Sequence, residues 1–160
     1  MKQMIKTCLV GCGKIADAHA AALSSIPDCE IVGVCDSEEL MARQLYERFK
    51  IGRYFQDIHQ MLDVTRPDVV HVTTPPQSHC ELGRICLDAG CHVYIEKPFA
   101  VSFKEAGLLI RLANDKGLKM TVGTDEQFSH VAIAMRRLIR EGYLGGPPVH
   151  MEAYYGYDLG

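Results

Sequence analysis

Short apolar segments alternate with longer amphipathic ones along the first three quarters of the chain. The apolar runs are typical of buried strands and occupy residues 4–10, 30–36, 68–73, 92–95 and 119–123. Helical spacing of apolar positions begins at Lys14 and recurs over residues 37–49, 76–89 and 102–116. Buried strands separated by amphipathic helices predict a parallel sheet covered on both faces, with right-handed crossovers. The predicted fold class is α/β, a doubly wound parallel sheet.

Several residues predict where the helices begin, end and pack. The helix that starts at Lys14 is expected to bury the side formed by Ile15, Ala18, Ala22 and Leu23. Ser37 is expected to cap the next helix, whose first turn carries acidic residues. Gly90 and Gly117 stand where a helix needs a left-handed residue to stop.

The pattern changes after residue 123. A further helix is expected to turn one side inward, made of Val131, Met135, Leu138 and Ile139. A glycine-rich stop follows at residues 142–146, and residues 149–157 then alternate as in a strand with one buried face. Such a strand needs a cover, so it either pairs with another chain or belongs to a second sheet that this chain does not complete.

Composition excludes several classes of protein. The net charge of −3 gives no reason to expect a nucleic-acid partner. Charge or glycine interrupts every long apolar stretch, so neither a membrane span nor a signal peptide is predicted, and we expect a cytoplasmic protein. The seven cysteines lack zinc-ligand spacing and are interpreted as structural thiols, with no metal site expected.

A phosphate-binding turn is predicted between the first strand and the first helix. The G-x-G-x-x-A pattern runs through Gly11, Cys12, Gly13, Lys14, Ile15 and Ala16. Gly11 would permit the tight turn, Gly13 would let the backbone approach a pyrophosphate, and Ala16 would let helix and strand pack closely. The free amides at the helix start supply an anion site. A plain tight turn is the alternative.

An acidic residue stands at the end of the second strand. Asp36 lies twenty residues beyond Ala16, where a carboxylate can accept hydrogen bonds from both hydroxyls of an adenosine ribose. Since a carboxylate repels a 2′-phosphate, the prediction is NAD rather than NADP. The alternative makes Asp36 a helix cap.

Two further segments follow strands, at the edge where open parallel sheets bind ligands. Candidate cofactor-binding residues after the strand at 68–73 are Thr73, Thr74, Pro75 and His79. A proline-started helix with a threonine cap would explain this segment equally well. Glu96 and Lys97 follow the strand at 92–95, and Pro98 pushes Lys97 toward an extended conformation.

Together these residues resemble the Gfo/Idh/MocA oxidoreductase family. The resemblance rests on the turn at 11–16 with His19 in its helix, Asp36, the Thr74-Pro75 and His79 pair, Ala89-Gly90-Cys91-His92-Val93 leading into Glu96-Lys97-Pro98, and the segment 138–147. It implies a Rossmann NAD(P)-binding domain over residues 1–123. Residues 124–160 would then be the crossover helix and first strand of an incomplete α+β domain for substrate and oligomerisation.

The resemblance also implies an activity. Hydride would pass between nicotinamide and a hydroxyl-bearing carbon of a sugar, cyclitol or related compound, with Glu96 on the nicotinamide ribose and Lys97 as the catalytic residue. The segment 124–128 departs from the family's usual pattern, and the acid-base residues of the second domain lie outside this chain. A homo-oligomer through the C-terminal strand is expected. A non-catalytic NAD sensor and an adenosine-binding methyltransferase are the alternatives, but neither explains Glu96 and Lys97.

Overall fold

The structure is a computed structural model that describes residues 4–150 and 152. It divides into two compact units, one ending at Gly123 and the other beginning at Thr124. None of the helices in the described residues combines the length and the apolar character that a membrane span requires.

The first unit alternates strands and helices. Its strands are β1 (Ile5–Val10), β2 (Cys29–Cys35), β3 (Tyr54–Phe55), β4 (Val69–Val72), β5 (His92–Ile95) and β6 (Met120–Val122). Its helices are α1 (Lys14–Ser24), α2 (Glu39–Phe49), α3 (Ile58–Thr65), α4 (His79–Asp88) and α5 (Phe103–Asp115), with a 3₁₀ turn, η1, at Pro76–Ser78. The strands and helices predicted from the periodicity are all present, with ends shifted by a few residues.

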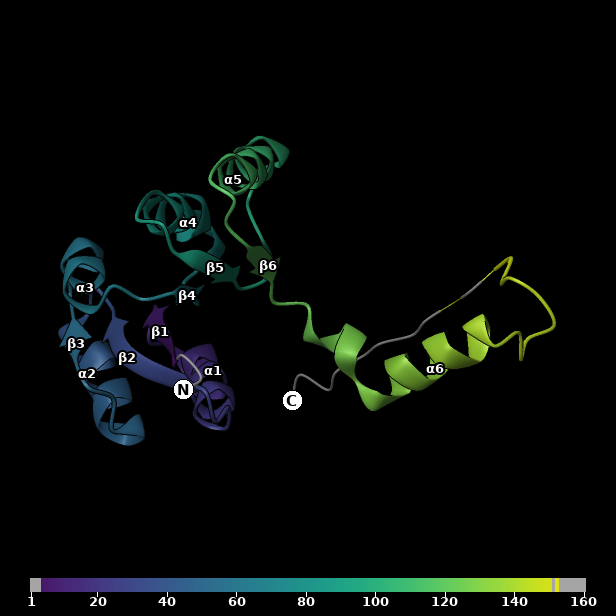
Figure 1. Ribbon diagram of the computed structural model, residues 1–160, viewed down its shortest axis with the longest axis horizontal. Helices are drawn as coiled ribbons and strands as arrows, with labels where there is room; N and C mark the ends of the chain where they lie inside the picture. Colours follow the sequence, from purple (N-terminus) through teal and green to yellow (C-terminus); the bar gives the residue numbers. More distant parts are fainter. Residues whose placement is uncertain (1–3, 151, 153–160) are drawn as a thin grey trace, which may run out of the picture. The chain divides into compact units, whose positions relative to one another are not determined.

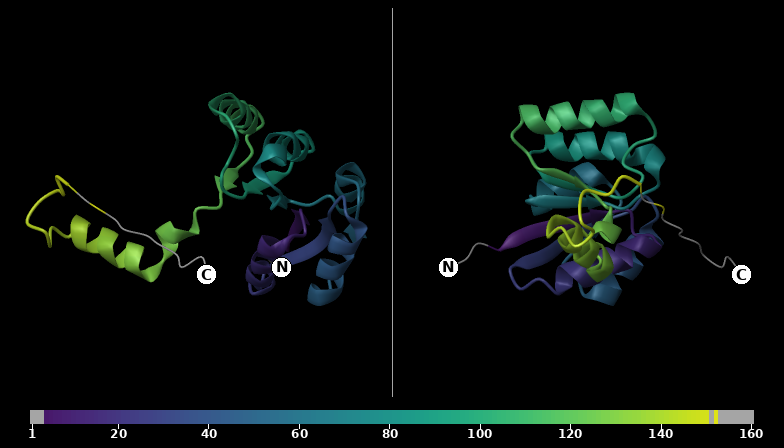
Figure 2. Two further views of the ribbon diagram at one scale, coloured as in Figure 1. Left: turned by 180° about the vertical axis from the view of Figure 1, so that it is seen from behind. Right: turned by 90° about the vertical axis from the view of Figure 1, so that its right-hand side faces the viewer.

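The six strands form one parallel sheet in the order β3-β2-β1-β4-β5-β6. The chain therefore winds outward from β1 to one edge, crosses to β4 and winds to the other edge. Helices α1 and α2 lie on one side of the sheet, and α3, α4 and α5 lie on the other (Figures 1 and 2). The predicted doubly wound α/β fold is confirmed.

Successive side chains of β1 point to opposite faces of the sheet, so this strand contributes to the hydrophobic cores on both sides. Cys8 and Val10 belong to the core that packs under α3, α4 and α5, whereas Leu9 belongs to the core under α1 and α2. All three side chains are buried, because the parallel sheet has helices on both sides at this strand.

The buried side of α1 differs from the prediction. Ala16, Ala20 and Leu23 face the sheet, while Ile15, Ala18 and Ala22 are exposed. The two fully buried positions of α1 are alanines, Ala16 and Ala20, so the predicted side is out of phase with the one that meets the sheet. Only Leu23 of the predicted set is therefore in the core.

Three local predictions also need correction. Ser37 does not cap α2, which begins at Glu39; the amide of Glu38 instead donates to the Asp36 carboxylate at 3.0 Å. The predicted helix 76–89 is a 3₁₀ turn followed by α4. Elements β3 and α3 were not predicted, although Asp57 caps α3 by accepting a hydrogen bond from the amide of Gln60.

The expectation of full cover on both faces holds for only part of the sheet within residues 4–123. Helices α1 and α2 lie over the β1–β3 half of their face. On the other half the side chains of Val69, His71 and Tyr94 are only partly buried, and they border a hollow of about 560 Å³.

The second unit contains a 3₁₀ turn, η2 (Asp125–Phe128), and the helix α6 (His130–Arg140). Ser129 caps α6 by accepting from the amide of Ala132, and Gly142 follows the helix with a φ of 76°. The predicted inward side is wrong here: Val131 is 77% exposed and Met135 47%, because the described part of this unit offers no second layer against which a helix could pack. The predicted strand 149–157 lies largely outside the described residues.

Candidate functional site

The turn between β1 and α1 is shaped by a close contact with the loop after β4. Gly11 has a φ of +91°, a left-handed conformation in which a side chain is strained. A Cβ here would stand 2.6 Å from Cγ2 of Thr74 and 2.8 Å from the Thr74 amide nitrogen. The Gly11 amide donates to the carbonyl of Cys35 at 2.8 Å, which ties the turn to β2.

Gly13 has a different setting from Gly11. It is the N-cap of α1 with φ −74° and ψ −173°, values open to any residue, and a Cβ here would meet no heavy atom within 4 Å. Packing within the protein therefore does not require a glycine at this position. A ligand that approaches the start of the helix closely would require one, because a Cβ would stand in its way. Behind the turn Ala16 is fully buried, and Lys14 and Ile15 are exposed.

Asp36 follows β2 and faces the same turn. One carboxylate oxygen accepts from the amide of Cys12 at 2.7 Å, and the other accepts from the amide of Glu38 at 3.0 Å. The structure thus places the carboxylate both against the glycine turn and at the start of α2. Each oxygen keeps a further lone pair for a hydroxyl donor.

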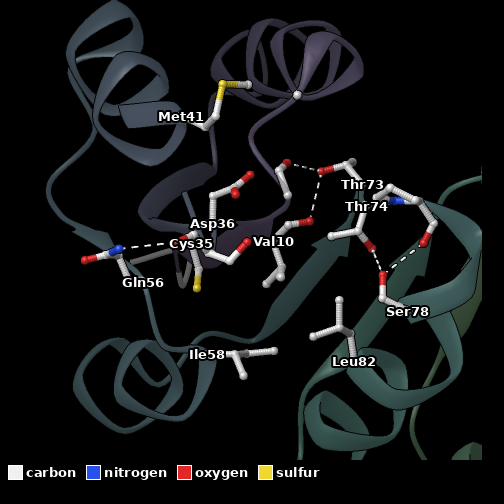
Figure 3. Close-up of a pocket in the computed structure, with 14 residues that line it drawn as sticks. Val10, Cys35, Asp36, Met41, Gln56, Ile58, Thr73, Thr74, Ser78 and Leu82 are labelled. Carbon is white, nitrogen blue, oxygen red and sulfur yellow. Dashed lines mark hydrogen bonds between the residues drawn. The ribbon is translucent and has the colours of Figure 1, made fainter. Parts of the chain in front are cut away.

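A cavity of about 410 Å³ opens between these elements, at the carboxyl edge of the sheet where the strand order reverses between β1 and β4 (Figure 3). Six of the predicted site residues line it: Gly11, Gly13, Asp36, Thr73, Thr74 and Pro75. Its apolar walls were not predicted, and they include Val10, Met41, Ile58 and Leu82. Open α/β sheets bind ligands at such a reversal.

The loop after β4 is held to the end of β1 and the glycine turn by Thr73, whose amide donates to the carbonyl of Val10 at 2.8 Å. Oγ1 of Thr73 donates toward the carbonyl oxygens of Gly11, at 2.6 Å, and Val10, at 3.1 Å. Thr73 is buried, so this bond fixes the distance between the two sides of the cavity. Ser78 adds a bond from its hydroxyl to Oγ1 of Thr74 at 2.7 Å.

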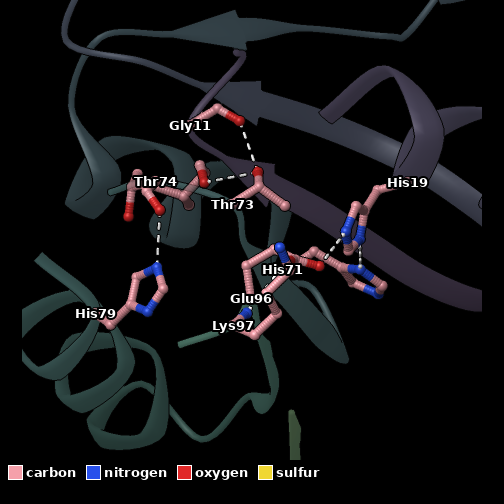
Figure 4. A network of polar contacts seen from close by, with 9 residues as sticks. Gly11, His19, His71, Thr73, Thr74, His79, Glu96 and Lys97 are labelled. Carbon is pink, nitrogen blue, oxygen red and sulfur yellow. Dashed lines mark hydrogen bonds and ion pairs between the residues drawn. The ribbon is translucent and has the colours of Figure 1, made fainter. Parts of the chain in front are cut away.

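His79 lies behind the cavity and does not line it. Its side chain is fully buried, with Nε2 2.7 Å from the carbonyl oxygen of Thr74 and Nδ1 3.0 Å from that of Pro98. The residue therefore joins the loop after β4 to the loop after β5; its bond to Thr74 is drawn in Figure 4. The peptide bond between Lys97 and Pro98 is cis, which the sequence did not indicate.

Glu96 and Lys97 follow β5, two strand positions from the glycine turn. Glu96 is only 9% exposed, and its carboxylate accepts from Nε2 of His19 at 3.0 Å and from the amide of Lys97 at 3.1 Å. Lys97 is exposed. Neither residue is part of the cavity lining, so the predicted residues form a cavity group and a separate group at β5.

The thiols offer no nucleophile at this site. Burial raises the pKa of Cys12 to about 12, with the Asp36 carboxylate as the second cause, and burial likewise raises the pKa of Cys35 to about 12. Both stay protonated at neutral pH, and all seven cysteines are free. Among the described residues no three His, Cys, Asp or Glu side chains gather as metal ligands would.

Comparison with known proteins identifies the family to which the chain belongs. The model of the oxidoreductase family with an NAD-binding Rossmann fold matches residues 5–124. D-glucoside 3-dehydrogenase of Escherichia coli is 32% identical over 142 residues, and myo-inositol 2-dehydrogenase of Thermotoga maritima is 24% identical over 141 residues. Each match covers 88% of this chain, and this chain spans 40% and 42% of those proteins.

A solved structure with bound cofactor is also similar. The WlbA dehydrogenase from Chromobacterium violaceum, in complex with NADH and UDP-GlcNAcA, superposes with a TM-score of 0.84 at 28% identity. The superposition covers 91% of this chain and 42% of that protein.

Proposed function

This chain belongs to the oxidoreductase family with an NAD-binding Rossmann fold, and we propose that it is the cofactor-binding part of an NAD-dependent dehydrogenase. The proposed reaction transfers a hydride between nicotinamide and a hydroxyl-bearing carbon of a sugar, cyclitol or related compound. NAD supplies the hydride-accepting ring when it is bound.

One observation carries the proposal: the glycine turn and the Asp36 carboxylate face a single cavity at the reversal of strand order. The open space at Gly13 leaves room for a pyrophosphate at the start of α1, where backbone amides and the helix dipole favour an anion. The residues present therefore fit a dinucleotide. Thr73 and Thr74 would shape the opposite wall.

Asp36 is proposed to select NAD over NADP. Its oxygens already accept two backbone amides, which fix the carboxylate toward the cavity. Both hydroxyls of an adenosine ribose could then donate to it, whereas a 2′-phosphate would meet like charge.

Glu96 and Lys97 are proposed to serve the nicotinamide end. The buried Glu96 carboxylate would accept from the nicotinamide ribose. The exposed Lys97 ammonium would stabilise negative charge that develops on the substrate oxygen, and it could hold the proton that moves there. Replacement of Lys97 by Met is expected to leave NADH affinity within about threefold, since a single exposed charge contributes little to binding.

The relatives' names support a sugar or cyclitol as substrate, since they act on D-glucosides and myo-inositol. Residues 124–160 are proposed to begin the domain that binds it. Self-association through the strand 149–157 is also proposed, from its alternating pattern, and sedimentation of the chain tests it. A cytoplasmic location is proposed because the seven cysteines are all free thiols.

Calorimetric titration of the 160-residue chain with NADH and NADPH tests the cofactor proposal. NADH is expected to bind more tightly than NADPH, and Asp36→Ala is expected to weaken NADH about 10- to 150-fold, because charged hydrogen bonds contribute ~1.5–3 kcal/mol. Asp68→Ala is the matched control, since Asp68 accepts the Lys6 amide at 2.8 Å from the opposite edge of the sheet. An unchanged NADH preference in Asp36→Ala would remove its selecting role, and binding of neither dinucleotide would refute the proposal.

A further inference from the structure

A polar chain of largely buried side chains ends on the Glu96 carboxylate. Nε2 of His19, on α1, donates to Oε1 of Glu96 at 3.0 Å, and Nδ1 of His19 lies 2.9 Å from Nδ1 of His71 on β4 (Figure 4). The side chains of His19 and Glu96 are only 10% and 11% exposed. Three elements far apart in sequence thus converge on one carboxylate.

The two imidazole rings are held in place by packing. The His71 ring stacks on Tyr94 with centroids 4.7 Å apart and planes within 6°. The His19 ring stands edge-on to both, 5.2 Å from His71 and 5.1 Å from Tyr94. Aromatic contacts of this kind restrict ring rotation, so the direction of the His19 Nε2–H bond is set before any ligand arrives.

The protonation state of His71 follows from its burial. Burial, and secondarily the charge of His19, lowers the pKa of His71 to about 4, so His71 is neutral near pH 7. The short contact between the two Nδ1 atoms requires one proton between them. His71 thereby holds Nδ1 of His19, while Nε2 of His19 points at Glu96.

Glu96 itself has little freedom. Its Oε2 accepts from the Lys97 amide at 3.1 Å, and a Cβ on Gly123 would lie 2.5 Å from its Oε1. With both oxygens held, the lone pairs that remain point in fixed directions. A carboxylate prepared in this way loses little conformational entropy when a hydroxyl donor binds.

We propose that His19 is a positioning residue that orients Glu96 for the nicotinamide ribose, and that His71 fixes the orientation of His19. The proposal rests on the proposed function, in which Glu96 accepts from that ribose. It predicts that the pair serves the nicotinamide half of the cofactor alone. Asp36 and Glu96 follow β2 and β5, which are three strand spacings apart, about 14 Å.

Two substitutions of His19 separate positioning from general support. The amide nitrogen of Gln reaches the place of His Nε2, so His19→Gln keeps a donor to Glu96. The shorter Asn places its amide nitrogen near Nδ1, so His19→Asn keeps the contact with His71 and loses the one with Glu96. We would titrate the 160-residue wild type and both variants with NADH and with ADP, which carries only the adenosine half.

The expected result is a fall in NADH affinity of about five- to tenfold in His19→Asn, less than the loss of a charged hydrogen bond to the cofactor itself, because the lost bond only orients Glu96. A smaller fall is expected in His19→Gln, which keeps the donor to Glu96 but loses the contact with His71. ADP affinity should be the same in all three proteins. Equal NADH affinity in His19→Asn and wild type would overturn the proposal. A parallel loss of ADP and NADH would also overturn it, because His19 would then support the whole domain.

A second pair keeps the test available if a His19 variant does not fold. His71→Asn keeps a nitrogen near Nδ1, while His71→Leu removes it, so NADH affinity should fall only in His71→Leu. Equal NADH affinity in the two His71 variants would contradict the role of His71. If wild type binds NADH no more tightly than ADP, the role of Glu96 is refuted. If wild type binds neither ligand, the proposed function itself is refuted.

Discussion

Alanine at Gly11 and at Gly13 should have opposite effects on folding and binding, although the two glycines stand two residues apart. At Gly11 the φ of +91° places an L residue in a strained region, which costs ~1–2 kcal/mol. The new Cβ would also stand 2.8 Å from the Thr74 amide nitrogen and 2.9 Å from the carbonyl carbon of Thr73. These are backbone atoms that cannot rotate away, so overpacking adds ~1–3 kcal/mol.

The sum for Gly11→Ala is a loss of about 2–5 kcal/mol, against a total stability of ~5–15 kcal/mol for a typical domain. With a urea m value of ~2 kcal/mol per molar, the unfolding midpoint should fall by about 1–2.5 M. Gly13→Ala meets no neighbour within 4 Å, so its stability should stay within ~0.5 kcal/mol of wild type. Its NADH affinity should nevertheless fall about 10- to 150-fold, since the methyl group would stand between the helix start and a pyrophosphate.

Urea unfolding of wild type, Gly11→Ala and Gly13→Ala measures their stability. NADH titration of the same three proteins, without urea and under conditions in which each is folded, measures their affinity. An unchanged midpoint in Gly11→Ala would refute the packing argument. Wild-type NADH affinity in Gly13→Ala would refute the placement of a pyrophosphate at the start of α1, whatever Gly11→Ala does.

Three further outcomes are expected. Gly123→Ala should displace Glu96, whose Oε1 would lie 2.5 Å from the new methyl group, and should lower NADH affinity with ADP affinity unchanged; equal loss of both would count against this. The folded pKa of His71, about 4, lies below the ordinary 6.5, so the folded protein binds fewer protons between these values. The contribution of His71 to the free energy of unfolding should therefore be complete above pH 6.5. It should decrease toward pH 4 by up to about 1.4 kcal/mol per pH unit, and the decrease should be smaller in His71→Asn. Equal pH slopes of the two proteins in urea titrations would contradict this. Finally, iodoacetamide at pH 8 should leave Cys8 and Cys86 unmodified in the native protein, since both are fully buried with raised pKa values, and mass spectrometry of labelled peptides would detect any exception.

Periodicity predicted the fold well because parallel strands are apolar along their whole length. It failed where an element is short: β3 has two residues, Tyr54 and Phe55, which is too few for a pattern. Helix α3 had a readable start, since Asp57 caps it and Met61 and Leu62 follow at helical spacing. The side of α1 was misassigned in phase: Ala18 and Ala22 were predicted to be buried, whereas the alanines that face the sheet are Ala16 and Ala20.

The candidate site was predictable where spacing implies geometry, as for Gly11, Gly13 and Asp36 around one cavity. The contribution of His71 was not predictable, because a histidine inside a strand carries no signal of what lies opposite it. Its contact with His19 joins α1 to β4, 52 residues along the chain. The apolar wall from Met41 and Leu82 likewise depends on how helices pack, which periodicity does not specify.

The close approach of Gly11 to Thr74 limits how this domain can be recombined with its relatives. The two residues come from separate crossovers, yet a Cβ cannot be added at Gly11 without moving Thr74. A chimera that takes the segment before β4 from a relative and keeps the loop after β4 would combine a glycine turn and a loop from different proteins, whose backbones need not pack at this distance. Crossover points for such chimeras should therefore lie outside residues 11–74, so that the turn and the loop are inherited together.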